Sequence, residues 1–277
     1  MVPAHTAIGR GFLSLRELEL QTMPLRNDFF DAFSPNLRNL QIGHYSSTNA
    51  QEFESSCHTW ARCFPSLERL TCDVEGIHEE EDDVDAPPAT LSAFITPLLA
   101  LSSITVFHLT SHPHGFSVNN ADVAALARGW PHIIELVLYS RAFNDPTSEP
   151  LHEMVTSAAL LTLARACPEL RILALPGLCV AEDELSPTKI SEVPLLAHGL
   201  EKLDLGRVMV TDASMCALLL DRIFPQLDVS EEEYLGPALQ RIDDVSEEWL
   251  PVKLALAAFR LASRQNEERR KCQGKGP

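Results

Sequence analysis

Aromatic and basic side chains are both scarce in this sequence, and each shortage excludes a class of protein. Aromatic residues make up 6% of the 277 positions, so a core drawn from the 45% of hydrophobic residues must be mainly aliphatic. Lys and Arg number 22 against 39 Asp and Glu, which leaves a net charge of -17. Nucleic-acid binding requires basic side chains that neutralise phosphates, so we expect no nucleic-acid partner.

Long apolar runs, a leader segment and an even set of cysteines are also missing. No apolar run reaches the roughly 18 residues of a membrane-spanning helix, so no membrane partner is expected. Residues 1–5 do not form a basic region followed by an apolar one, and no signal peptide is visible. The seven irregularly spaced cysteines fit buried free thiols in a reducing compartment. We therefore expect an intracellular, cytoplasmic protein.

The sequence contains none of the common catalytic motifs. There is no Gly-rich phosphate loop, no Gly-x-Ser-x-Gly elbow and no Cys-x-x-Cys pair. The best candidate for a metal site is His108 with His112 and His114, but no Cys or acidic residue stands near them in the sequence. Zinc requires at least three ligands in a fixed geometry. We expect no catalytic residues, no cofactor and no metal, and hence a protein that is not an enzyme.

A repeated pattern of leucines is what the sequence does contain. The stretch from Cys167 to Leu175 consists of a turn followed by Leu-x-x-Leu-x-Leu, which is the strand segment of a leucine-rich repeat. The same pattern recurs at intervals of 22 to 37 residues. Seven copies begin at Leu15, Leu37, Leu67, Ile104, Ile133, Leu170 and Leu200, and an eighth, broken copy begins at Leu227. The alternative is a set of unrelated short strands in an ordinary α/β domain.

Corners and helices are expected between these strands. A proline stands two residues before the first apolar position in five places, where it should end the preceding helix. The residue before the proline is often bulky or apolar and is expected to plug the corner between helix and strand: Phe64, Trp130, Cys167 and Phe224. Apolar residues at helical spacing fill the intervals, and three residues are candidate N-caps: Asn49, Thr90 and Thr211.

Each unit is then one strand and one helix, which can bury their apolar faces only by stacking on neighbouring units. We therefore predict an α/β leucine-rich-repeat solenoid, with parallel strands on the concave face of an arc and helices on the convex face. The array should occupy residues 1–228. Residues 229–263 should form a helical cap, with Trp249, Val252, Leu256 and Phe259 on one helix face. With no cap before Leu15, the chain is expected to be the C-terminal part of a longer design, or a product without its first module.

Two charged segments have more than one interpretation. Residues 79–85 carry six carboxylates and no basic residue, which indicates a mobile solvated loop, a contact for a basic partner, or a weak calcium site. The basic tail, residues 264–277, is expected to be frayed. Its run Arg269-Arg270-Lys271 also fits a nuclear signal, so the nucleus is the alternative location.

The concave face is the expected binding surface. In Leu-x-x-Leu-x-Leu the second and third leucines point inward, so the residues that flank them face outward. Apolar residues gather there in the middle of the array, where Tyr139 is the expected anchor. The predicted contact residues are Val106, His108, Glu135, Val137, Tyr139, Ile172, Ala174 and Lys202. In the alternative, loops of the chain itself fold over the apolar members and bury them.

Three segments share one layout of corner residue, proline and strand start: Phe64-Pro65-Ser66-Leu67-Glu68-Arg69-Leu70, Trp130-Pro131-His132-Ile133 and Cys167-Pro168-Glu169-Leu170-Arg171-Ile172-Leu173. With helices of irregular length between them, they resemble the repeat region of F-box/LRR proteins, particularly divergent fungal ones. The resemblance implies recognition of a protein substrate for a ubiquitin ligase. A cullin-ligase adaptor is an expected partner only if an F-box precedes this sequence, which contains no F-box pattern itself. The alternative is a repeat scaffold or inhibitor without a link to ubiquitin.

Overall fold

The computed structural model describes residues 12, 14–21, 29–30, 33–46, 50–75, 89–112, 115–140, 154–228 and 249–273, without the side chains of residues 112, 267, 268 and 270–273. The acidic segment 79–85, the candidate cap Asn49 and the first part of the expected cap therefore lie outside the described residues. Within the described part, no helix combines the length and apolarity that crossing a membrane requires.

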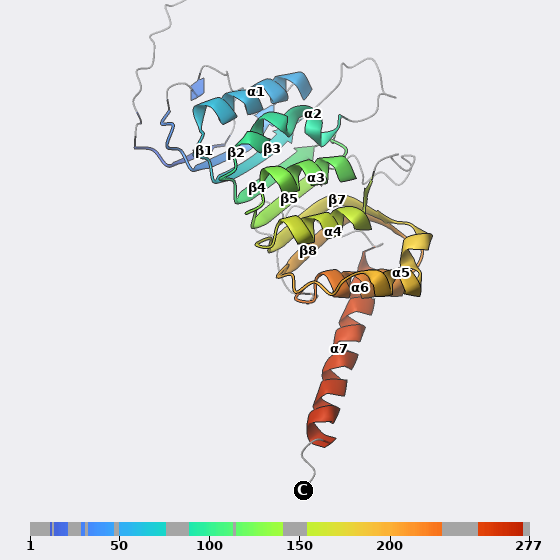
Figure 1. Ribbon diagram of the computed structural model, residues 1–277. Coiled ribbons are helices and arrows are strands. Elements are labelled where there is room, and N and C mark those ends of the chain that lie inside the picture. Colours follow the sequence, from blue (N-terminus) through green and yellow to red (C-terminus); the bar gives the residue numbers. More distant parts are fainter. Residues whose placement is uncertain are drawn as a thin grey trace, which may run out of the picture.

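A parallel β-sheet of eight strands forms the frame of the molecule (Figure 1). Its strands are β1 (Glu17–Leu20), β2 (Asn39–Ser46), β3 (Arg69–Glu75), β4 (Val106–His112), β5 (Glu135–Ser140), β6 (Val155–Thr156), β7 (Ile172–Val180) and β8 (Lys202–Val210). They lie in chain order, except that the short β6 pairs only with the end of β7. The fold class is therefore α/β, as predicted.

The strand register follows the leucine pattern. The second position of each copy lies beside the second position of the next, in the row Leu18, Leu40, Leu70, Phe107, Leu136, Leu173 and Leu203. Leu173, the sixth member of this row, is fully buried, as the pattern predicts. Because a slip of one residue would turn every one of these side chains to the opposite face, burial of the row fixes the register.

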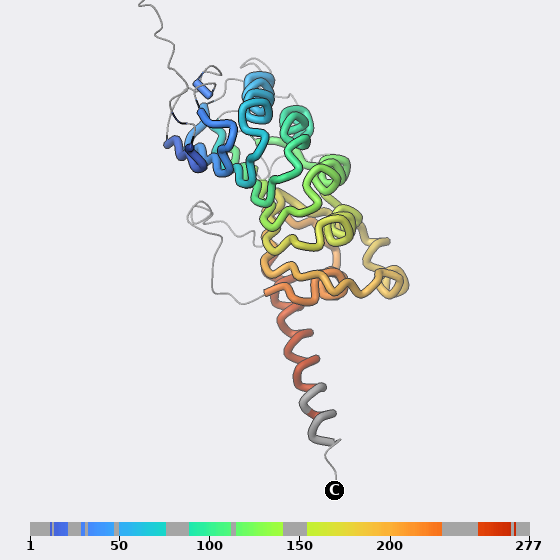
Figure 2. Tube along the Cα trace, turned by 60° about the vertical axis from the view of Figure 1, so that its left-hand side comes forward, coloured from blue at the N-terminus to red at the C-terminus, as the bar shows by residue number. Residues whose placement is uncertain are grey.

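Helices follow the strands on one face of the sheet. They are α1 (Ala50–Cys63), α2 (Leu91–Ile95), α3 (Asn120–Gly129), α4 (Ser157–Ala166), α5 (Pro187–Glu192) and α6 (Ala213–Ile223), with 3-10 turns η2 (Thr96–Ala100) and η4 (Glu182–Leu185). Seen from the side in Figure 2, the helices lie one above another along one side of the molecule. Neighbours α1 and α2, α3 and α4, and α4 and α6 are in contact.

The corner between helix and strand has the same hydrogen bonds in several units. The amide of each corner residue donates to the carbonyl four residues earlier at 2.7 to 2.8 Å, in Phe64, Trp130, Cys167 and Phe224. Each of these four residues is fully buried. Their own carbonyls accept from the first residue of the following leucine pattern at 3.1 Å, for example from Leu170. The predicted corner plugs are thus confirmed.

A further backbone bond links each unit to the next. The residue after the first leucine-pattern position donates to its counterpart in the preceding unit at 2.6 to 2.8 Å. The chain of donors and acceptors runs through Arg16, Arg38, Glu68, Thr105, Ile134, Arg171, Glu201 and Asp228. Because the same amide and carbonyl are used in unit after unit, the sequence repeat is also a repeat of hydrogen bonding.

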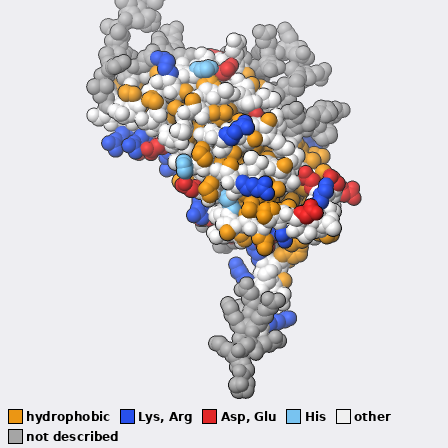
Figure 3. All heavy atoms as spheres, in the orientation of Figure 1, with side chains coloured by type: hydrophobic (Ala, Val, Ile, Leu, Met, Phe, Trp, Pro, Cys, Tyr) orange, Lys and Arg blue, Asp and Glu red, His pale blue; other side chains and the backbone are white. Residues whose placement is uncertain are grey.

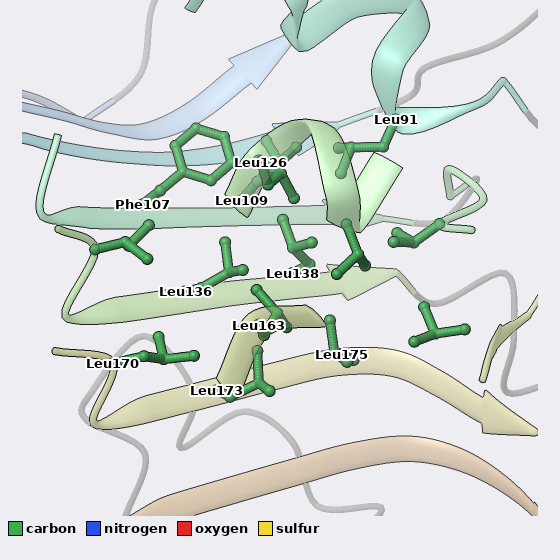
Figure 4. Packing of buried hydrophobic residues seen from close by; sticks show 14 of the residues in the cluster. Leu91, Phe107, Leu109, Leu126, Leu136, Leu138, Leu163, Leu170, Leu173 and Leu175 are labelled. Atoms are coloured by element: carbon green, nitrogen blue, oxygen red, sulfur yellow. The ribbon is translucent and has the colours of Figure 1, made fainter. Parts of the chain in front are cut away.

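The core between sheet and helices is aliphatic in the middle and aromatic near the start. Figure 4 shows the middle, where side chains of β4, β5 and β7 such as Leu136 and Leu173 meet Leu126 and Leu163 of the helices. Near β2 the rings pack edge to face instead: Phe30, Tyr45, Phe53, Trp60, Phe94 and Phe116. Most ring-to-ring contacts of the core therefore lie in its N-terminal part, although Phe107 and Trp130 form one in the middle.

Helix α7 (Leu250–Gln273) closes the C-terminal end of the core. Trp249, Val252 and Leu256 are buried there, as the predicted cap requires, whereas Phe259 is 36% exposed. Arg260 holds the helix to α6 through Asp221, at 3.1 Å from Nε to Oδ1. The helix continues through Gln273 instead of ending near residue 263, so the described part of the expected frayed tail is helical.

Candidate binding surface

The sheet face opposite α1, α2, α3, α4 and α6 is here called the open face. Since side chains alternate along a strand, the open face carries the residues that flank the buried leucines. One row across it consists of Glu17, Asn39, Arg69, Val106, Glu135, Ile172 and Lys202. The next row consists of Glu19, Gln41, Thr71, His108, Val137, Ala174 and Asp204. The predicted contact residues therefore do lie on adjacent strands.

The apolar members of the predicted surface are buried, however. Val137 is only 1% exposed, and Val106, Tyr139 and Ala174 are exposed by 5%, 8% and 4%. Val137 and Ala174 form a small apolar cluster separate from the main core, with Ile172 packed against them and partly exposed. The expectation of an exposed apolar patch is therefore wrong for these four residues, which are buried within the chain itself.

Apart from the partly exposed Ile172, the accessible side chains in the middle of the open face are polar and charged. Nε2 of His108 lies 3.1 Å from Oε2 of Glu135 on the next strand. Nη2 of Arg69 lies 4.0 Å from Oε1 of the same carboxylate. Arg69 and Glu135 are two strands apart, about 10 Å at the usual spacing, so the long arginine side chain has to reach across Val106. We call Arg69, His108 and Glu135 the polar triad.

Burial keeps the His108 member of the polar triad uncharged. Desolvation lowers the pKa of His108, and nearby Arg69 lowers it further, while Glu135 acts in the opposite direction. The net pKa lies below the ordinary value of 6.5, so the imidazole is neutral at neutral pH. A neutral His108 can donate its Nε2 proton to Glu135, which orients both side chains. The triad thus presents a fixed arrangement of one cation, one anion and one imidazole.

At the β8 end of the open face, Asp204 is a half-buried carboxyl. Burial raises its pKa above the ordinary value of 3.8, while Lys253 of α7 lowers it by a smaller amount. The predicted contact residue Lys202 lies two positions before it, on the same face and partly exposed. This end of the face therefore combines both signs of charge beside the start of α7.

The charged side chains on the opposite side of the molecule gather beside α5. Figure 3 shows acidic side chains there, at the right of the helix-covered face, and Glu182 and Asp183 are exposed. Asp183 is paired with Lys189, whose Nζ lies 2.7 Å from its Oδ2. Charge on this face is thus partly neutralised within one short segment.

Two of the three candidate metal ligands and the buried thiols can be placed in the described part of the chain. In the described part of the chain, no group of three His, Cys, Asp or Glu side chains could hold a metal ion. His108 is engaged with Glu135, His112 ends β4, and His114 lies outside the described residues. Burial raises the pKa of Cys167 to about 11 and that of Cys216 to about 12, so both thiols stay protonated at neutral pH. They serve as small apolar core groups.

Comparison with protein-family models finds no match to this chain, and comparison with curated proteins finds none either. Function therefore has to be argued from the site itself. The leucine pattern also gives Arg69 and Asp204 outward positions, but neither residue is among the predicted contact residues. A signal was available for Arg69, which shares a row with Glu135 and is long enough to reach it.

Proposed function

We propose that this chain is a leucine-rich-repeat solenoid that binds a protein partner on its open face. The recurrence of one corner geometry and one backbone ladder supports the repeat assignment. Helices α1, α2, α3, α4 and α6 lie on the other face, and Arg69, His108, Glu135 and Ile172 are at least partly accessible on the strands. The observation that carries the binding proposal is the polar triad, three pre-oriented groups of different charge at the centre of that platform.

The polar triad suits recognition of a protein more than of a small molecule. Arg69 is half exposed, with 52% of its side chain accessible, while Glu135 is 25% accessible and already fixed by its neighbours. Pre-oriented charges of this kind give specificity and register to an interface. Ile172 beside the triad adds apolar area that a partner can cover. We expect a partner segment with a carboxylate for Arg69 and a polar group for Glu135.

Within this class, we propose a relationship to the substrate-recognition repeats of F-box/LRR ubiquitin-ligase receptors. The corner segments around Phe64, Trp130 and Cys167, which have one geometry, support the resemblance. The alternative is a repeat scaffold or inhibitor. A direct assay separates the two: the longest transcript-derived form of the protein is mixed with a cullin-ligase adaptor, and stable binding favours the receptor. Absence of binding by that form favours the scaffold.

The binding proposal is tested by exchanging the charges of the triad. In the double variant Arg69→Glu with Glu135→Arg, the internal ion pair is retained but the pattern offered to a partner is reversed. Full-length bait proteins are compared by quantitative affinity capture. The exchange should reduce recovery of specific partners tenfold to a hundredfold, which corresponds to about 1–3 kcal/mol. Arg128→Glu on α3 is the matched control on the helix-covered side, where Arg128 is exposed.

Thermal melting of both variants shows whether each remains folded. If Arg128→Glu abolishes capture while the triad exchange leaves it intact, the partner binds the helix-covered face and the proposal is wrong.

A further inference from the structure

Helix α7 has two sides of different character. It leaves the body at the C-terminal end of the sheet and extends well away from it (Figures 1 and 2). On one side, Val252 and Leu256 are buried and Arg260 binds Asp221 and the carbonyl of Phe224, at 3.1 and 3.0 Å. This contact accounts for only one side of the first part of the helix.

The opposite side carries a row of exposed leucines. Leu250, Leu254 and Leu261 are exposed by 45%, 56% and 59%. At about 100° per residue these three positions fall within one narrow stripe, roughly 160° around the helix from Val252 and Leu256. We call these three residues the leucine stripe. Exposed leucines in a row are unusual on a free helix surface and indicate a contact.

Basic side chains border the leucine stripe. Arg264 and Arg269 are exposed, and they lie roughly 60° to one side and roughly 80° to the other side of it. Residues 250–273 contain six Lys and Arg but two Glu, whereas the whole chain contains 22 Lys and Arg and 39 Asp and Glu. The helix that carries the leucine stripe is thus positively charged, although the chain as a whole is negatively charged.

The size of the leucine stripe argues against a protein as the main occupant. A standard protein–protein interface buries about 800 Å² per partner and is centred on aromatic and arginine anchors. Three leucines, each exposed by about half, fall well short of that area. A second α7 packed in parallel would also bring Arg264 and Arg269 against their own copies. Binding to an anionic lipid surface requires neither a large contact area nor aromatic anchors. The insertion of apolar side chains and the attraction of basic side chains to the lipid both contribute to the binding free energy.

We propose that α7 binds anionic lipid surfaces as an interfacial helix. The leucine stripe inserts between acyl chains at the headgroup boundary, and Arg264 and Arg269 extend sideways to lipid phosphates. The helix lies in the plane of the surface and does not cross the bilayer, in keeping with the lack of a spanning helix among the described residues. This differs from the expectation, drawn from the absence of long apolar runs, that no membrane is a partner. The inference is independent of the open face.

Vesicle sedimentation with the full chain tests the proposal. Vesicles of phosphatidylcholine and phosphatidylserine at about 2:1 are compared with vesicles of phosphatidylcholine alone. Wild type should sediment with the anionic vesicles, and the double variant Leu254→Ser with Leu261→Ser should bind them at least tenfold more weakly. Arg264→Gln with Arg269→Gln should also weaken binding, and about 0.5 M salt should suppress it by screening. The matched control is Leu195→Ser, since Leu195 is 75% exposed but lies between α5 and β8.

The proposal is overturned if wild type does not prefer anionic vesicles, or if the two leucine changes leave vesicle binding at the wild-type level. It is also overturned if light scattering shows a dimer that the leucine changes dissociate, because a second copy would then occupy the stripe. All substituted residues are exposed, so loss of folding is not expected, and circular dichroism of each variant verifies this.

Discussion

Asp204 is a partly buried carboxyl group whose surroundings disfavour its charged form. It stands in a row of the open face where the neighbouring strand offers only Ala174, and burial raises its pKa. Lys253 compensates in part. When folding raises the pKa of a carboxyl group, the folded protein becomes less stable as the pH rises above the pKa of that group in the unfolded chain. The reason is that the unfolded chain releases the proton at a lower pH than the folded protein does. At neutral pH the ionised Asp204 therefore costs stability.

We expect Asp204→Asn to be more stable than wild type at pH 7, because the amide carries no buried charge. The sign of the linkage then gives the pH dependence. The difference in melting temperature should shrink as pH falls toward 3.8, where Asp204 becomes protonated in both states. Melting curves at a series of pH values measure it. Glu192→Gln on α5, where the carboxyl is exposed, is the control and should shift melting by the same small amount throughout. If Asp204→Asn raised the melting temperature equally at all pH values, a raised pKa of Asp204 would not be the cause.

At the scale of single elements, the N-termini of the helices differ in whether a side chain accepts hydrogen bonds from the first amides. Asn119 begins α3 with a complete capping box: its Oδ1 accepts from the amides of Ala121 and Asp122, and Asp122 accepts from the Asn119 amide. Asp122 also accepts from the amide of Ser92, which links α2 to α3 at 3.0 Å. Thr90, by contrast, starts α2 without a side-chain cap bond.

Asn119→Ala should destabilise the protein by about 1 kcal/mol, because two amides of the first turn lose their acceptor. Thr90→Ala is the matched control, since it removes a hydroxyl at the same helix position without breaking a cap bond. Its effect should stay within about 0.5 kcal/mol. Urea unfolding monitored by circular dichroism gives both values. Equal losses for the two changes would mean that the box at Asn119 contributes nothing beyond helix propensity.

At the scale of the whole molecule, the first part of α7 is buried against the body and the last part is exposed. Trp249, Val252 and Leu256 are buried against the last units, whereas the described side chains beyond Leu261 are exposed. A parallel sheet with stacked helices leaves an apolar end wherever the stacking stops. The first part of α7 covers that end. We therefore expect the first part of the helix to contribute much more to the stability of the fold than the last part.

Two truncations separate these two parts. Removal of residues 263–277 should leave the melting temperature within about 2 °C of wild type, because the side chains that the structure describes there are exposed. Removal of residues 249–277 exposes three large apolar contacts worth about 1.5–3 kcal/mol each and should lower it by more than about 10 °C. Calorimetry of both forms measures the shifts. A large loss from the shorter truncation would show that the distal helix packs on the body. The same truncation removes Arg264 and Arg269, so it should weaken vesicle binding while the fold is kept.

The sequence by itself determined the parallel strands, their register and their corners. Leu136, Leu173 and Leu203 lie side by side because each belongs to the same short local pattern, and the alternation of a strand leaves no second choice of face. The bulky residues before proline, such as Trp130 and Cys167, were likewise predictable, since proline ends the helix at a known position. The charge and the apolar spacing of α7 could also be read, but the exposure of Leu254 and Leu261 could not.

Only the tertiary structure decided which open-face residues are accessible. Val137 and Tyr139 occupy outward positions in the local pattern, yet they are buried. The pattern sets the direction of a side chain, but the exposure of that side chain depends on what the rest of the chain places around it. The helix start at Asp212, one residue after the expected Thr211, was settled by side-chain bonds to two amides. Arg69 meets Glu135 across an intervening strand, and no spacing along one chain segment encodes that contact. Local patterns specify which face a side chain takes, whereas packing between distant units specifies what that face exposes.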